Sequence, residues 1–122
     1  MHWSFTDTSP IFIQIAQLLE EDIFSGLYRE EEQIPSTTEV SVSYRLNPAT
    51  VLKGYNILVD KDYIYKRRGI GMFVKEGALE RIREERRQRF RKDFLVPFMA
   101  EAKRLGLTEE DLRDMISERE DS

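Results

Sequence analysis

Two helix starts follow each other closely near the middle of the chain, and their spacing constrains the fold more than any other feature. Residues 36–39 read STTE, in which a serine can cap a helix and a glutamate three residues later can accept a bond from the serine N–H. Eleven residues after that serine, Asn47 supplies a second cap and Pro48 suits the first position of a helix. A short helix ending near residues 44–45 and a tight turn of about three residues fit between the two starts. The spacing therefore predicts a helix-turn-helix.

A further helix is predicted ahead of this pair. Ser9 is a candidate cap, Pro10 suits the first helical position, and Gly26 suits the residue just past the end. Between them, apolar residues recur at three- and four-residue spacing and form one stripe, namely Phe12, Ile15, Ala16, Leu19 and Ile23. This helix is expected to support the fold.

A β-hairpin is predicted directly behind the helix pair. Residues 63–74 read YIYKRRGIGMFV, two β-rich runs separated by a stretch in which Gly69 and Gly71 permit a tight turn. A hairpin in this position turns a helix-turn-helix into a winged helix, and its tip carries Lys66, Arg67 and Arg68. Residues 1–75 are therefore predicted to form a winged helix-turn-helix DNA-binding domain.

The remaining residues, 76–122, are predicted to form a helical tail. A long helical pattern runs from Ala78 to Gly106, with Pro97 expected to kink it, and Thr108 begins a final helix. The apolar residues of this tail exceed what a lone helical hairpin can bury, so a second copy of the chain is the expected partner. The residues expected at this dimer interface are Phe90, Phe94, Leu95, Phe98, Leu105, Leu112 and Ile116. The fold class is thus mainly α with a small β-hairpin: a winged helix-turn-helix followed by a two-helix dimerisation tail.

Charge is distributed unevenly along the chain, whose formal net charge is −4. Residues 1–39 contain one basic residue against eight acids, whereas residues 40–75 contain seven basic residues against two acids. A basic segment in an acidic chain is typical of phosphate binding, although plain solvated surface gives the same pattern. Residues 81–92 also hold seven basic residues, and here a solvated helix face with intrahelical Glu–Arg pairs is expected, with contact to DNA flanks left open.

The third predicted helix has two distinct faces. Val51, Gly54, Tyr55 and Leu58 fall at i, i+3, i+4 and i+7 and are expected to face inward. The N-terminal end of such a helix enters the major groove in helix-turn-helix proteins, where its first turns reach phosphates and base edges. The residues left on its outer and flanking surfaces are Ala49, Thr50, Leu52, Lys53 and Asn56. The alternative at this point is a three-helix core whose outer face is polar without binding anything.

Several classes of function are disfavoured by what the sequence lacks. There is no cysteine, and His2 is the single histidine, so neither a thiolate or metal site nor a cofactor site is predicted. The GIG stretch lacks the strand-to-helix context of a phosphate-binding loop, and the carboxylate clusters are typical of solvated turns, so an enzyme is not expected. The N-terminus has no signal-peptide pattern and no apolar run approaches a membrane span, which predicts a cytoplasmic protein. Trp3 and Phe5 are expected to pack against the domain.

The segments PIFIQIAQLLEEDIFSG, IPS with Glu39, NPATV, GYNIL and RRGIGMFV, in this order, resemble the N-terminal winged helix of GntR-type bacterial transcription regulators. The resemblance runs from about residue 9 to 75, and NPATVLKGY with a short helical tail is most similar to the YtrA-like subfamily. It implies a dimeric repressor on a pseudo-palindromic operator, with control of neighbouring transporter genes. The DNA contacts that it implies are Ser36, Thr38, Asn47, Ala49, Thr50, Leu52, Lys53, Arg68 and Gly69. Arg67 is added as a further predicted contact because it lies at the tip of the predicted hairpin.

This sequence departs from the family pattern at positions that read bases. Thr38 and Leu52 stand where members commonly carry arginine, and so does Pro48, although proline is usual there in the subfamily. Each lost arginine removes a bidentate guanine contact of roughly 1–3 kcal/mol. Binding is therefore expected to depend on phosphate contacts, the wing and apolar readout, and the operator sequence is not predicted.

A second hypothesis stays open beside the regulator. The chain would then be a protein-interaction module, a winged helix that has lost base recognition and binds another protein through its Leu52 face or its tail. The tail of roughly 45 residues is too short for a separate effector domain, and a small effector at the dimer interface is neither predicted nor excluded.

Overall fold

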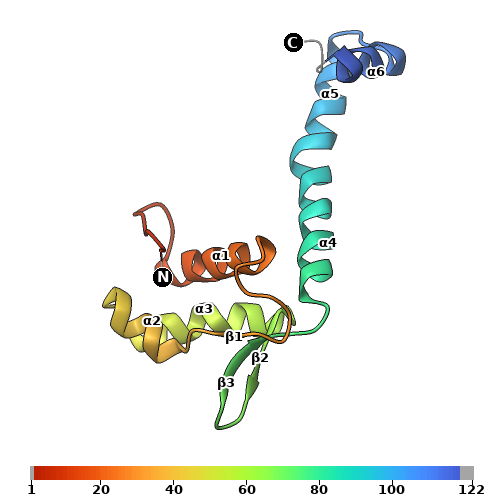
Figure 1. The fold of residues 1–122 in the computed structure, drawn as a ribbon. Coiled ribbons are helices and arrows are strands. Elements are labelled where there is room, and N and C mark those ends of the chain that lie inside the picture. Colours follow the sequence, from red (N-terminus) through yellow and green to blue (C-terminus); the bar gives the residue numbers. More distant parts are fainter. Residues whose placement is uncertain (1, 119–122) are drawn as a thin grey trace. The chain divides into compact units, whose positions relative to one another are not determined.

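The computed structural model describes residues 2–118 of the chain. These residues form two compact units that meet at residues 84 and 85. The first unit contains three complete helices, the start of a fourth and a small sheet, and the elements of the second are all helical (Figure 1). The mainly helical fold with a winged helix-turn-helix is therefore confirmed.

The first helix, α1, spans Ile11–Phe24. The predicted cap was wrong by one residue, because Pro10 and not Ser9 occupies the N-cap, with φ −56° and ψ 142°, and no side chain caps the helix. The Ser9 carbonyl instead accepts a 2.7 Å bond from the side-chain amide of Gln14. At the other end Ser25 is the C-cap, and Gly26 follows with φ +90°, as predicted.

The helix-turn-helix consists of α2, Thr37–Tyr44, and α3, Pro48–Asp60. The predicted capping box is present, since the Glu39 N–H donates to the Ser36 hydroxyl at 3.0 Å and the Ser36 N–H donates back to the Glu39 carboxylate at 3.3 Å. Asn47 caps α3 by accepting from the Ala49 N–H at 2.8 Å. In the turn, Arg45 adopts a left-handed conformation with φ +55°.

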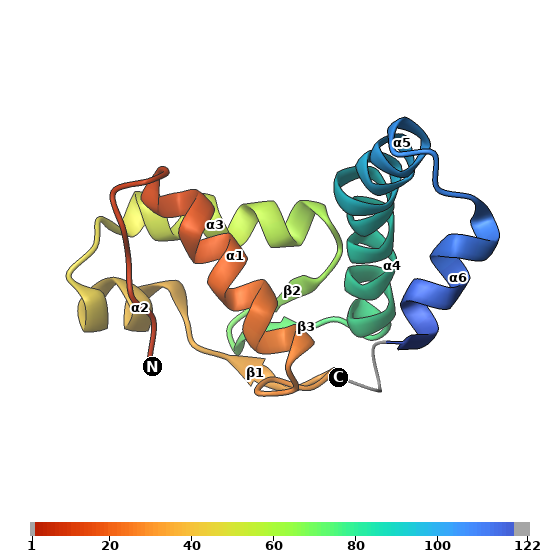
Figure 2. The same cartoon turned by 90° about the horizontal axis from the view of Figure 1, so that it is seen from above.

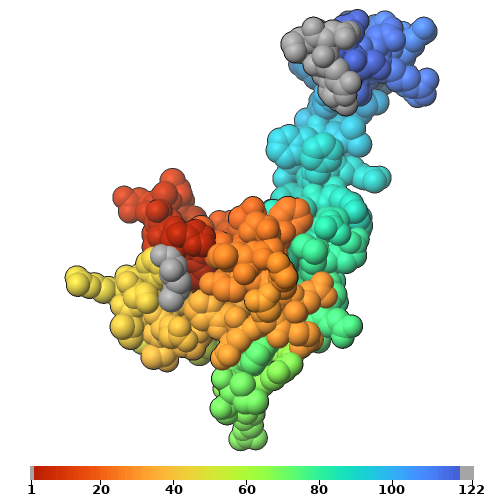
Figure 3. Space-filling view, in the orientation of Figure 1, coloured from red at the N-terminus to blue at the C-terminus, as the bar shows by residue number. Residues whose placement is uncertain are grey.

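The sheet contains three antiparallel strands in the order β1-β3-β2. The predicted hairpin is confirmed as β2, Ile64–Arg67, and β3, Gly71–Val74. The first strand, β1, Gln33–Ile34, was not predicted, because a two-residue strand shows no periodicity. The hairpin projects from the body of the first unit, as the green segment in Figures 1 and 3 shows.

The core of the first unit lies between α1 and α3, which cross in contact in Figure 2. The inward face predicted for α3 is confirmed, since all four of its residues are buried. Tyr55 also donates a 2.6 Å bond to the Pro35 carbonyl and so holds α3 to the segment before α2. Trp3 is buried as expected, with its ring stacked on Tyr44 at 5.6 Å between centroids.

The long helical pattern of the tail is divided into several elements. Helix α4, Ala78–Phe90, begins in the first unit, where Ala78 and Ile82 join the core. It is followed by a π-helical turn η1, Arg91–Leu95, and by α5, Val96–Arg104. Pro97 lies in the first turn of α5, so the irregularity precedes the proline, which cannot donate a backbone bond to the preceding turn.

The final helix of the described chain is α6, Glu109–Glu118. Its predicted start is confirmed by two reciprocal bonds, from the Asp111 N–H to the Thr108 hydroxyl at 3.1 Å and from the Thr108 N–H to the Asp111 carboxylate at 2.9 Å. Among the helices of residues 2–118, none has the length and apolar character needed to cross a membrane.

Candidate nucleic-acid interface

The N-terminal half of α3 exposes a short row of small and apolar side chains. Ala49 and Leu52 are exposed, Leu52 at 51%, and Thr50 is half-buried beside them. The Asn47 cap uses its side chain to bind the Ala49 N–H, which fixes the start of the helix. This end of the helix therefore presents methyl groups and a hydroxyl on a rigid backbone.

Lys53 adds a positive charge to this surface in a defined position. Its ammonium lies 4.0 Å from the centroid of the Phe12 ring, which belongs to α1. Such a cation–π contact contributes about 0.5–1 kcal/mol at an exposed site. The lysine is thus partly ordered before any ligand arrives.

The first residues of α2 lie at the other side of the helix-turn-helix. Ser36 uses its hydroxyl oxygen as an acceptor in the capping box, which leaves the hydroxyl proton available to a phosphate. Thr38 is exposed and places a second hydroxyl on the same helical turn. Val42, which the sequence reasoning did not select, is 73% exposed further along α2.

The turn between α2 and α3 is held by a residue that the sequence reasoning missed. The hydroxyl of buried Ser41 donates a 2.7 Å bond to the Leu46 carbonyl. This bond fixes the turn that sets the angle between the two helices. A serine inside a helix offers no local signal of such a role, since serine hydroxyls bond backbone carbonyls in many contexts.

The two arginines of the wing have different environments. The Arg67 guanidinium donates to the Glu31 carboxylate at 2.9 Å and to the Tyr65 hydroxyl at 3.0 Å, and it lies 4.2 Å from the Phe73 ring centroid. The bond from the Tyr65 hydroxyl, and next the charge of Arg67, hold the pKa of Glu31 below its usual range. Within residues 2–118, no hydrogen bond or ion pair engages Arg68, which is exposed. Arg68 is therefore the arginine available to a ligand.

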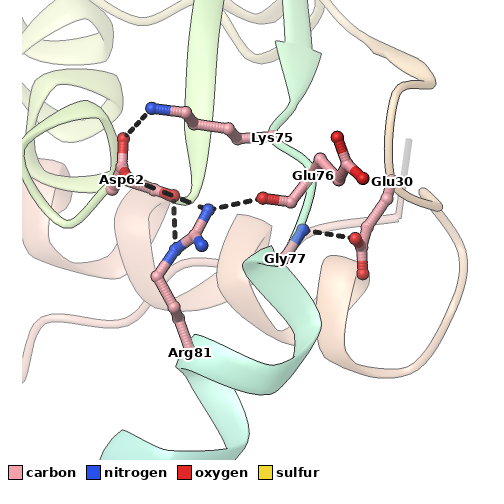
Figure 4. A network of polar contacts seen from close by, with 6 residues as sticks. All are labelled: Glu30, Asp62, Lys75, Glu76, Gly77 and Arg81. Atoms are coloured by element: carbon pink, nitrogen blue, oxygen red, sulfur yellow. Dashed lines mark hydrogen bonds and ion pairs between the residues drawn. The ribbon is translucent and has the colours of Figure 1, made fainter.

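A polar network ties the base of the sheet to the start of α4 (Figure 4). Asp62, which has φ +67°, accepts a 2.5 Å bond from Lys75 and offers its carbonyl to Arg81 at 3.0 Å. Arg81 also donates to the Glu76 carbonyl at 2.7 Å, and the Gly77 N–H donates to Glu30. The hydrogen bond from Lys75 is the main reason that the pKa of Asp62 lies below its ordinary value. The network joins segments that are far apart in sequence and fixes the first turn of α4.

The arrangement of α1, the helix pair and the hairpin corresponds to a known family. The sequence profile of bacterial regulatory proteins of the gntR family matches residues 13–74, from α1 through β3. The chain belongs to the GntR family. GntR proteins are DNA-binding transcription regulators and not enzymes, which confirms the predicted class of function.

The similarity of this GntR regulator to its relatives extends over its tail as well. The HTH-type transcriptional regulator YhcF of Bacillus subtilis is 31% identical over 92% of this chain and 91% of its own length. The HTH-type transcriptional repressor YtrA of the same organism is 29% identical over 91% of this chain and 85% of its own length. A crystal structure of a putative GntR-family regulator from Bacteroides thetaiotaomicron is 36% identical, covers 88% of this chain and 94% of its own, and superimposes with a TM-score of 0.74. The resemblance to the YtrA type is therefore confirmed over nearly the full chain.

The second unit of this GntR chain contains all seven residues predicted for a dimer interface. Six of the seven have exposed side chains: Phe90, Phe94, Leu95, Phe98, Leu105 and Ile116. Leu112 differs, because it is 7% exposed and already covered within the α5–α6 hairpin, where Ala102 is also buried. An apolar groove on this unit is lined by Phe90, Asp93, Phe94, Leu95, Pro97, Phe98 and Ile116.

The basic run of α4 contains the intrahelical pairs expected for a solvated face. Arg83 bonds Glu80 at 2.8 Å, and Arg89 bonds Glu85 at 2.9 Å. Across the part of the chain that the structure describes, no cluster of three or more histidine, cysteine or carboxylate side chains could hold a metal ion.

Proposed function

We propose that this GntR regulator is a dimeric repressor that binds a pseudo-palindromic operator in the cytoplasm. The observation that carries the proposal is the exposed N-terminal half of α3, with Leu52 and Lys53, in the same basic segment as the free Arg68 of the wing. The name of the relative YtrA, a repressor, supports repression. Control of neighbouring transporter genes is the expectation that comes with the YtrA-type resemblance.

The contacts follow from the chemistry of each exposed side chain. Ser36, Thr38 and Asn47 are suited to phosphate contacts, because their polar groups lie at or near helix N-termini. Thr50 and Lys53 can bond phosphate or base edges in the major groove, whereas Ala49 and Leu52 can contact thymine methyl groups. Specificity at the Leu52 position is therefore apolar and favours A·T pairs.

The second unit supplies the dimer contact in this proposal. Its exposed phenylalanines and aliphatic residues lie between the end of α4 and α6, several of them around one apolar groove, and a monomer would leave this surface in water. A two-fold dimer places two copies of α3 on two half-sites, which matches a pseudo-palindromic operator. We therefore place the dimer interface at Phe90, Phe94, Leu95, Phe98, Leu105 and Ile116, with Leu112 supporting the hairpin from inside.

A protein-interaction module is the competing function. The exposed side chains of Val42 and Leu52, together with threonine in place of arginine at position 38, are the observations that favour it. Such a module would bind DNA weakly and without regard to sequence.

Binding to DNA taken from upstream of the protein's own gene separates the two functions. Fluorescence anisotropy across about 50–200 mM salt should show a tight complex that weakens steeply, with a slope that reports the number of phosphate contacts. Lys53→Ala and Arg68→Ala should each weaken binding roughly tenfold and reduce the slope by about 0.9. Arg29→Ala is the matched control, since this exposed arginine lies in the α1–β1 connection and should leave binding unchanged.

Equal, weak binding to every DNA fragment would refute the repressor and favour the interaction module. Light scattering tests the dimer separately. A dimer is expected at micromolar concentration, and a monomer under these conditions would contradict the role of the second unit.

A further inference from the structure

The tip of the wing carries one large apolar residue, Ile70, whose side chain is exposed. Ile70 is 64% exposed and lies between Gly69 and Gly71. Neither glycine has a side chain, so Ile70 is the group that a surface approaching the tip meets first, beside the arginine at position 68. The hairpin projects from the first unit in Figures 1 and 3, which leaves this tip accessible.

We propose that Ile70 enters the DNA minor groove as an apolar reader and so gives the wing a preference for A·T pairs. The inference rests on the proposed function and extends it to a residue outside the predicted contacts. In the minor groove, a G·C pair differs from an A·T pair by the guanine amino group. A branched alkyl group cannot accept a bond from that amino group, and it meets the group sterically. The apolar side chain is therefore better accommodated over A·T pairs, where the groove is also most negative and attracts the adjacent Arg68.

The backbone on both sides of Ile70 is held in place before DNA binds. The Ile70 N–H donates to the Arg67 carbonyl at 2.9 Å, which closes the hairpin turn. The Ile70 carbonyl accepts a 3.2 Å bond from the side-chain amide of Gln33, which belongs to β1. Gly71 has φ +147°, and a Cβ there would lie 2.5 Å from the Gln33 nitrogen, so only glycine lets this amide approach.

The strands of the same hairpin are held by a separate set of contacts. Arg67 binds Glu31 and the Tyr65 hydroxyl and covers the Phe73 ring, so it belongs to the wing's support. A tip that is ordered in advance loses less conformational entropy on binding. Gln33 and Arg67 are thus positioning residues for Ile70 and Arg68.

A protein partner is the other class of molecule that could meet an exposed isoleucine. A DNA partner fits the surroundings of Ile70 better, since Lys66 and Arg68 are exposed on the same hairpin and the two flanking glycines leave a narrow tip. A narrow cationic tip with one apolar group matches the minor groove in shape and charge. Binding to protein becomes an outcome of the test below.

The test uses the full chain and the upstream DNA fragment that binds it. Hydroxyl-radical footprinting first identifies the A·T pairs protected in the minor groove by the wing. Ile70→Ala should weaken binding to this DNA roughly tenfold. The salt slope should not change, because no charge is removed, whereas Arg68→Ala should reduce it by about 0.9. Leu27→Ala, at an exposed aliphatic residue away from the wing, is the matched control and should bind as the wild type does.

DNA fragments with substituted base pairs then test whether Ile70 discriminates between A·T and G·C pairs. Replacing the protected A·T pairs by G·C should weaken the wild type several-fold, and replacing them by inosine·C, which lacks the amino group, should restore binding. Ile70→Ala should discriminate less among the three fragments. Gln33→Ala should lose part of the same discrimination while its circular dichroism melt stays close to that of the wild type.

A failure of the inference about Ile70 can be distinguished from a failure of the proposed repressor function. If Ile70→Ala binds the wild-type DNA normally, or loses the same factor on all three fragments, the inference is overturned while weakened binding by Lys53→Ala still supports the repressor. If Lys53→Ala and Arg68→Ala also bind DNA normally, the proposed function fails, and the inference about Ile70 fails with it. This is the result expected if Ile70 contacts a protein partner.

Discussion

Gly54 is the residue whose replacement tests the packing of α1 on α3 most directly. Alanine at this position would place a Cβ 2.8 Å from the Phe12 carbonyl oxygen and 2.9 Å from the Ile15 Cγ2 atom. Neither neighbour can move freely, since one is backbone in α1 and Ile15 is fully buried. The substitution must therefore push the two helices apart or distort one of them.

Two effects of opposite sign decide the size of the change. Alanine improves intrinsic helix propensity by about 1 kcal/mol relative to glycine. Overpacking in a close-packed core costs about 1–3 kcal/mol. Because the contacts are shorter than ordinary van der Waals distances on two sides, the upper part of this range applies, and the net expected loss is about 1–2 kcal/mol. For a unit of this size that corresponds to a melting temperature lower by roughly 4–16 °C.

Urea denaturation followed by far-UV circular dichroism measures this loss for Gly54→Ala. The midpoint should fall while the slope with urea stays unchanged, since the folded state remains compact. Asn56→Ala is the matched control on the same helix, where an exposed side chain gives the propensity gain without a close contact. A Gly54→Ala protein as stable as this control would refute the reasoning, because helix propensity would then outweigh the contact with α1.

Three further predictions concern the N-terminal segment, the sheet base and the tail. Trp3→Ala should lower the unfolding free energy by about 3–5 kcal/mol in the same urea assay, because it removes a buried ring and the 2.9 Å bond from the indole to Asp22; a loss below about 1 kcal/mol would show that the segment packs loosely. Asp62, whose pKa is lowered chiefly by its bond from Lys75, contributes stability at pH values above its ordinary pKa of 3.8, and this contribution is lost as the pH falls through its lower folded value. The stability difference between wild type and Asp62→Asn should therefore shrink as acid is added, and a difference that stays constant with pH would contradict the role of this charge. Phe94→Glu should convert the expected dimer to a monomer by light scattering while the melt of the first unit is unchanged, and a dimer that persists would place the interface elsewhere.

The local features of this chain could be predicted from the sequence because their causes are local. A capping box, an Asn-Pro helix start and a glycine after a helix each act within about four residues. The helix-turn-helix and the final helix could therefore be predicted from their local sequence. The inward face of α3 followed from its spacing, since one stripe of a helix must pack on the body. The wing was predicted from two β-rich runs around glycines. The ordered motifs from α1 to β3 also allowed the resemblance to the GntR family to be recognised.

The tertiary structure decided which of several equivalent residues has which role. Arg67 and Arg68 are adjacent and chemically identical, yet only the fold brings Glu31 to one of them and leaves the other free. The same is true of Gln33 beside Ile70, of Leu112 inside its hairpin, and of the close approach that makes Gly54 necessary. These contacts join residues that are distant in sequence, or depend on how tightly two helices cross, and neither is encoded in local spacing. The sequence by itself thus determined most of the elements and the class of protein, whereas long-range packing added β1 and determined which side chains remain exposed on the helix pair and the wing.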